Sequence, residues 1–175
     1  MALVVFLRGA NVGGHKKFQP SVLAKALADF GLVNVGAAGT FVVRGKIGQA
    51  SLRAEILRRL PFKAELMICP AREIIDLARG EAFGGDSPEK DVRRFVSVME
   101  KSPRTLPRLP LDRPAGGRWQ VKVIGVSGRY ALSLQRRLGQ RIVYPNEVVE
   151  KSLGVSATTR GWNTIQAICH ILEGS

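Results

Sequence analysis

The chain has 175 residues, 45% hydrophobic and 23% charged, and its 27 lysines and arginines against 14 acidic residues leave a formal net charge of +13. This composition excludes a disordered chain and allows one ordinary domain or two small ones. No apolar run approaches the roughly 18 residues of a membrane span, and the apolar N-terminus has neither a basic region before it nor a cleavage site. We therefore expect a cytoplasmic protein with no membrane partner.

The first part of the chain predicts a strand, a helix, two strands, a helix and a strand. These elements are residues 3–7, 20–30, 33–35, 41–43, 51–60 and 63–69. We expect Pro20 to open the first helix, Gly31 to end it, and Ser51 to cap the second helix. This order is the split β-α-β pattern of a ferredoxin-like plait, in which right-handed crossovers place both helices on one face of an antiparallel sheet.

The second part of the chain, from residue 70, is expected to form a second unit. Its predicted helices and strands are residues 71–79, 91–99, 119–126, 129–134, 145–153 and 163–172. The proline-rich residues 102–117 predict a loop without regular structure. Asn163 and Gln166 are placed to cap the last helix reciprocally. We expect this second half to form a less regular, plait-like subdomain.

Residues that could carry catalysis or bind a metal are scarce. Cys69 and Cys169 each lie in an apolar stretch, which predicts two buried thiols and gives no support for a disulfide. No spacing of His, Cys, Asp or Glu is typical of a metal site, and no cofactor motif is present. His170 lies on an apolar helix face and is expected to be structural. We find no enzyme signature.

The stretch RGANVGGHKK, residues 8–17, is the first candidate site. Gly13 and Gly14 can present successive backbone N–H groups to an anion, Arg8 adds a bidentate donor, and a helix N-terminus follows. The stretch lacks the endings of a nucleotide P-loop and the GxGxxG spacing. The alternative is a tight strand-to-helix turn with solvated lysines, Lys16 and Lys17.

The stretch ATTRGWNT, residues 157–164, is the second candidate. Thr158 and Thr159 offer hydroxyl groups, Arg160 a guanidinium and Trp162 a ring on which a base could stack. In the alternative interpretation Trp162 anchors the core or an interface, and Asn163 only caps a helix.

The positive charge favours a polyanionic partner, and a nucleotide or a nucleic acid is the obvious class. However, the basic residues are spread along the chain, so general compositional bias is an alternative explanation. Stacking of RNA bases on the first sheet is not expected, because the strand of residues 3–7 has no polar face.

Three stretches of this chain resemble motifs of a bacterial domain-of-unknown-function family, number 1697. They are RGANVGG (residues 8–14), GTFVV (residues 39–43) and ATTRGWNT (residues 157–164). The resemblance implies two ferredoxin-like subdomains packed together, which we place at residues 1–69 and 70–175, and implies no activity. The middle motif departs from the family, because Ala38 and Thr40 stand where a serine and an asparagine are usual.

Together these observations predict an α+β protein that binds a phosphate-bearing ligand in a cleft formed by residues 8–17 and 158–162. The predicted ligand-binding residues are Arg8, Asn11, Gly13, Gly14, His15, Lys16, Thr158, Thr159, Arg160, Trp162 and Asn163. One alternative is an enzyme of unrecognised type, in which His15 acts as acid or base on an anionic substrate. Another is a structural or interaction module. The oligomeric state stays open.

Overall fold

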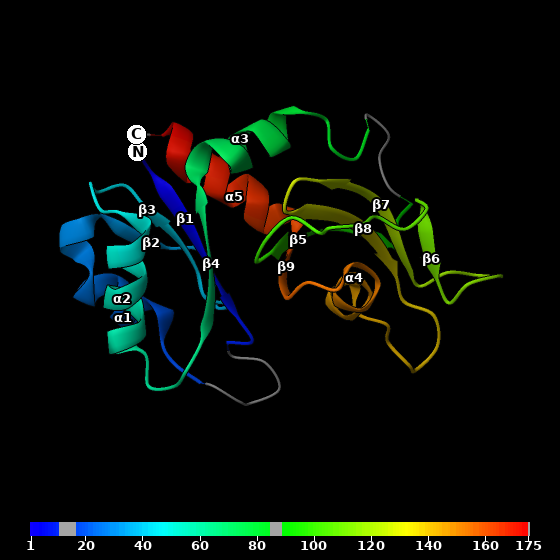
Figure 1. The fold of residues 1–175 in the computed structure, drawn as a ribbon, viewed down its shortest axis with the longest axis horizontal. Helices are drawn as coiled ribbons and strands as arrows, with labels where there is room; N and C mark the ends of the chain where they lie inside the picture. The colour runs from blue at the N-terminus through cyan, green and yellow to red at the C-terminus, as the bar shows by residue number, and fades with distance from the viewer. Residues whose placement is uncertain (11–16, 85–88, 175) are drawn as a thin grey trace. The chain divides into compact units, whose positions relative to one another are not determined.

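The computed structural model describes residues 1–10, 17–84 and 89–174, which form a mixed α+β protein with two antiparallel sheets (Figure 1). Two compact units are present, the first made of residues 1–80 and 164–175 and the second of residues 81–163. This division differs from the expected boundary after residue 69. Helix α3 (Ala71–Arg79) and the C-terminal residues belong with the first sheet, because α3 follows β4 (Glu65–Pro70) without a break and packs against it.

The sheet of the first unit has the strand order β2-β3-β1-β4. Its other strands are β1 (Leu3–Arg8), β2 (Leu32–Asn34) and β3 (Thr40–Val43), and β1 pairs with both β3 and β4. Leu3, Val5 and Leu7 alternate onto one face, where they meet helices α1 (Pro20–Ala26) and α2 (Gln49–Arg59) in a hydrophobic core. The predicted order of these six elements is confirmed.

Two details of these helices differ from the prediction. The helix expected over residues 20–30 ends at Ala26, and a separate 3-10 turn, η1 (Ala28–Phe30), follows it. Gly31 ends that turn in the left-handed conformation, with φ 63°. Ser51 does not cap α2, because the helix begins about one turn earlier, where the Leu52 N–H donates to the Gly48 carbonyl at 2.9 Å.

The sheet of the second unit has the order β6-β7-β8-β5-β9, and α4 (Pro145–Leu153) covers one of its faces. Its strands are β5 (Val92–Met99), β6 (Leu111–Arg113), β7 (Val121–Ser127), β8 (Tyr130–Arg136) and β9 (Ala157–Gly161). Val148 and Val149 of α4 pack on Val121, Val123 and Met99 of the sheet.

Two strands of this unit were not predicted. β6 lies inside the segment expected to be a loop and pairs with β7, and β9 coincides with the second candidate motif and pairs with β5. Because this pairing continues to Gly161, helix α5 (Trp162–Glu173) starts directly after the strand. Asn163 therefore lies inside α5 and does not cap it, contrary to the expectation from the sequence.

The two sheets share a strand order once β6 is set aside. In the second unit β7-β8-β5-β9 takes the places of β2-β3-β1-β4, and every neighbouring pair is antiparallel. The difference lies in the first connection. Helix α1 joins β1 to β2, whereas the irregular residues 100–120, with the short β6, join β5 to β7.

No helix among the described residues is long and apolar enough to cross a membrane. Both cysteines are free thiols: Cys69 is fully buried, and Cys169 is half-buried with its Sγ 3.9 Å from the Ile74 carbonyl oxygen. Burial, reinforced by the charge of Glu173, raises the pKa of the Cys169 thiol. The Cys169 thiol is therefore a poor nucleophile. The prediction of two buried thiols is confirmed for Cys69, whereas Cys169 is only half-buried.

The turn between β2 and β3 provides a test of how tightly the first sheet is packed. Gly36 and Gly39 both have positive φ, but a Cβ on Gly39 would lie 2.7 Å from a methyl carbon of Leu7, whereas a Cβ on Gly36 would meet nothing. We expect Gly36→Ala to lower the free energy of unfolding by about 1–2 kcal/mol, the cost of the left-handed backbone. Gly39→Ala should lower it by roughly 2–5 kcal/mol, because overpacking is added.

Urea denaturation of both variants measures this difference. Equal decreases in the free energy of unfolding would show that Leu7 moves aside without cost and would contradict the packing described for this turn.

Candidate functional site

Arg8 stands at the end of β1, opposite Glu65 of β4 in the strand register. Its Nη1 lies 3.3 Å from Glu65 Oε1, and the two side chains are 34% and 54% exposed. An ion pair this exposed is worth little, on the order of 0–1 kcal/mol. The pair therefore contributes little to the stability of the first sheet.

Five predicted ligand-binding residues, Asn11, Gly13, Gly14, His15 and Lys16, lie outside the described residues. Lys17, where the description resumes, is exposed. The next residue, Phe18, packs edge-on against Phe62, with ring centroids 5.8 Å apart. This aromatic pair anchors the chain just before α1 to the residues that follow α2.

The threonines of the second candidate motif lie on β9 and point to opposite faces of the sheet. Thr159 faces α4, where its hydroxyl donates to Asn146 Oδ1 at 2.8 Å. Ser97 Oγ of β5 lies 2.6 Å from the same hydroxyl oxygen, so the Ser97 hydroxyl is the donor in that contact. These bonds tie β9 to β5 and to α4.

Arg160 is buried, with 7% of its surface exposed. Its Nη1 donates to Thr158 Oγ1 at 2.7 Å and to the Thr159 carbonyl oxygen at 3.0 Å. Burial penalises the charged form and lowers the pKa of the guanidinium to about 10, so Arg160 is still a cation at neutral pH. The hydrogen bonds to Thr158 and Thr159 offset part of that cost.

Trp162, the first residue of α5, lies in an aromatic cluster. Its ring meets Phe83 edge-on, with centroids 5.0 Å apart and planes at 76°, and the Arg94 guanidinium lies 5.5 Å from the Phe83 ring centre. Within the second unit, the structure thus joins Thr158, Thr159, Arg160 and Trp162 to neighbouring protein groups. Arg8 belongs to the first unit.

Many arginines of this protein donate to main-chain carbonyl groups. Within the described residues, such bonds are formed by Arg44, Arg53, Arg59, Arg113, Arg129 and Arg160. A carbonyl oxygen satisfies the donor but carries no net charge. Except at Arg59, which also pairs with Glu55, these bonds therefore stabilise the fold and leave the positive charge of the guanidinium in place.

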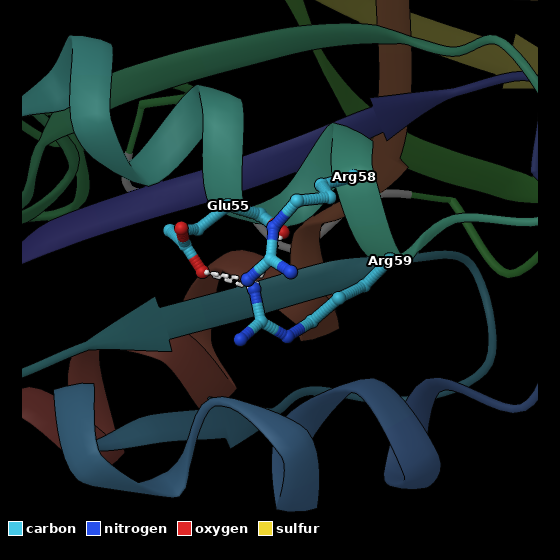
Figure 2. A network of polar contacts seen from close by, with 3 residues as sticks. All are labelled: Glu55, Arg58 and Arg59. Carbon is cyan, nitrogen blue, oxygen red and sulfur yellow. Dashed lines mark hydrogen bonds and ion pairs between the residues drawn. The ribbon is translucent and has the colours of Figure 1, made fainter.

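On α2, by contrast, a carboxylate neutralises part of the charge. Glu55 accepts from both Arg59 and Arg58, as Figure 2 shows. These two hydrogen bonds, the one from Arg59 first, lower the pKa of the Glu55 carboxyl group. One carboxylate thus pairs with two guanidinium groups on the surface of the first unit.

In the second unit, carboxylates pair with only some of the cations. Glu89 and Asp91 pair with Arg136, Asp91 also approaches Arg118, and Asp112 pairs with Lys122. Among the described residues, exposed cations without an ion pair in this unit are Lys90, Arg93, Lys101, Arg104, Arg108, Arg137, Arg141 and Lys151.

The sequence itself indicates this charge in two segments outside the two candidate motifs. Residues 113–146 contain seven basic residues and no acidic one, and residues 101–111 contain three basic residues and no acidic one.

No group of three or more potential metal ligands occurs in the described parts of the chain.

Comparison with known proteins identifies one family. Residues 1–126 match the family described as "protein of unknown function (DUF1697)". No curated protein matches the chain, and no solved structure does.

The contacts of Arg160 make it a test of whether the second motif supports the fold. We expect Arg160→Gln to lower the free energy of unfolding by about 1–3 kcal/mol, because the buried acceptors lose a charged donor. Arg93→Gln, an exposed position on neighbouring β5, is the matched control and should change it by less than about 0.5 kcal/mol. Chemical denaturation followed by circular dichroism measures both, and equal effects would contradict a supporting role for Arg160.

Proposed function

As the chain belongs to the DUF1697 family of proteins of unknown function, we propose from its own chemistry that it binds a phosphate-bearing ligand, either a nucleotide or a nucleic acid. The observation that carries this proposal is the set of exposed cations in the second unit that have no carboxylate partner among the described residues. Positive charge left unneutralised attracts phosphates over several ångströms and raises their local concentration.

Residues 101–108 are the densest part of this set. Lys101, Arg104 and Arg108 are all exposed and follow one another at intervals of three and four residues. Prolines separate them, so the backbone loses less entropy when the segment is ordered on a ligand. A nucleic acid strand can contact several of these cations through successive phosphates.

Arg8 supports the same function in the first unit, because its weak pair with Glu65 can be exchanged for an anion. The contacts of Arg160 and Trp162 favour a second candidate role for residues 158–162, that of a structural module within the second unit. The enzyme alternative depends on His15, which lies outside the described residues.

We extend the proposal to the fold type of each unit and to the location of the protein in the cell. We infer that the first unit is a ferredoxin-like plait and the second a plait whose first crossover helix is replaced by residues 100–120. The strand orders and the helix positions support this inference.

The two free thiols suit a reducing compartment, which supports a cytoplasmic location.

Salt dependence of binding to a short single-stranded oligonucleotide tests the function. The triple variant Lys101→Ala, Arg104→Ala, Arg108→Ala should weaken binding and reduce the slope of log K against log salt by roughly 2, or about 0.7 for each phosphate that no longer meets a cation. Fluorescence anisotropy at several salt concentrations measures this slope.

The matched control removes three arginines that already have carboxylate partners, Arg58, Arg72 and Arg79, and so changes the net charge equally. Its slope should stay close to that of the wild type. If wild type and both triple variants bind the oligonucleotide equally weakly, and binding disappears at physiological salt, nucleic acid is not the ligand and that form of the proposed function is wrong.

A further inference from the structure

We propose that the second unit contains a binding site for a small phosphate monoester whose organic part has an apolar face, the class to which nucleoside monophosphates belong. The site is a half-open cavity of about 690 Å³ beside α4, lined by residues from β6, from the segment before α4 and from α4 itself. This inference rests on the proposed function, to which it adds a place in the fold and a ligand class.

The cavity exists because one helix is absent. In the first unit, α1 and α2 together cover one face of the sheet. In the second unit α4 packs on the corresponding face, but residues 100–120 take the place of the other helix. A thin, irregular segment fills less space than a helix of about 10 Å diameter, so room remains between β6 and α4.

The charged groups around this cavity match a phosphate monoester. Arg113, Arg141 and Lys151 line it together with a single carboxylate, Glu147, which leaves two net positive charges (three minus one). A phosphate monoester carries about −1.5 to −2 at neutral pH. Arg141 and Lys151 are exposed, and neither has an ion pair among the described residues, so both are available to a ligand.

The remaining surface of the cavity suits a larger, apolar part of the ligand. Leu111, Ile142, Val143 and Val148 contribute apolar side chains. The volume falls within the roughly 300–1,000 Å³ typical of small-molecule sites and far exceeds what phosphate alone would fill. Glu147 can accept a hydrogen bond from a hydroxyl or amino group of that part.

One wall of the cavity is held in place by glutamine side chains. The Val143 N–H donates to Gln120 Oε1 at 3.1 Å, and the Val143 carbonyl accepts from Gln135 Nε2 at 2.8 Å. Gln135 is buried, with 7% exposed. Because Val143 is two residues from Arg141, these bonds position the segment that carries the guanidinium before any ligand arrives, which lowers the entropic cost of binding.

A titration with nucleoside monophosphates tests the inference. Adenosine, guanosine, cytidine and uridine 5′-monophosphate, inorganic phosphate and adenosine are titrated separately into the full chain by isothermal calorimetry at physiological salt. We expect at least one monophosphate to bind, and to bind at least about tenfold more tightly than inorganic phosphate or adenosine. The phosphate and the nucleoside contribute together to the binding free energy only when they belong to one molecule.

Two variants locate the binding. Arg141→Ala with Lys151→Ala should weaken monophosphate binding by about tenfold or more, because it removes two charged donors. Ser152→Phe leaves the charge unchanged and places a ring in the cavity, which should weaken binding to a similar degree. Arg72→Ala with Arg79→Ala removes the same charge outside the cavity lining, at arginines that already have carboxylate partners, and should change the affinity less than about twofold. Thermal unfolding of each variant confirms that it is folded.

The outcomes separate this inference from the function on which it rests. If the oligonucleotide binds but no monophosphate does, or if the cavity variants bind a monophosphate as tightly as the wild type, the cavity is not the site and the proposed function stands. If neither the oligonucleotide nor any monophosphate binds, both proposals are wrong. Inorganic phosphate binding as tightly as a monophosphate would overturn the ligand class, because the apolar wall would then contribute nothing.

Discussion

The hydrogen bond from a guanidinium to a main-chain carbonyl is the interaction on which much of this structure depends. Arg53 bonds to the Leu66 carbonyl on the edge strand β4, Arg129 bonds to Met99 at the end of β5, and Arg44 bonds to Ile171 in α5. Each bond joins a side chain to the main chain of another element or strand end. Because a carbonyl has no net charge, the fold is stabilised and the cation keeps its charge. The basic character of the chain is thus compatible with a well-paired structure and with a surface that attracts anions.

The second constraint is the sheet of the second unit, which has one helix on the face where the first unit has two. The place of the missing helix is taken by a segment rich in proline and arginine, which cannot form a long helix because proline lacks the N–H donor and blocks the preceding turn. The same residues therefore create the space beside α4 and supply cations near it. Residues 100–120 thus account both for the irregular backbone and for part of the positive charge of this unit.

Residues 158–162, predicted to bind a ligand, also form contacts that hold the second unit together. Thr159 links β9 to Ser97 and to Asn146 of α4, and Glu150 of α4 accepts from the Ala157 N–H at 2.9 Å. The hydroxyl, amide and carboxylate groups of these contacts belong to β5, β9 and α4. Here they satisfy one another between strand and helix, which accounts for a polar stretch on a strand that is largely buried.

The sequence by itself determined the order of the first six elements, because each has a clear apolar period and most are bounded by glycine or proline. It also determined the family and the net charge. The tertiary structure alone decided that β9 is a strand, since a short polar segment becomes one only when β5 offers a free edge. It likewise decided that Arg160 is buried whereas Arg141 lines a cavity. Arg160 lies opposite Val96 of β5, and Arg141 lines the cavity together with residues of β6. These neighbours are remote in the chain, and no local periodicity encodes them.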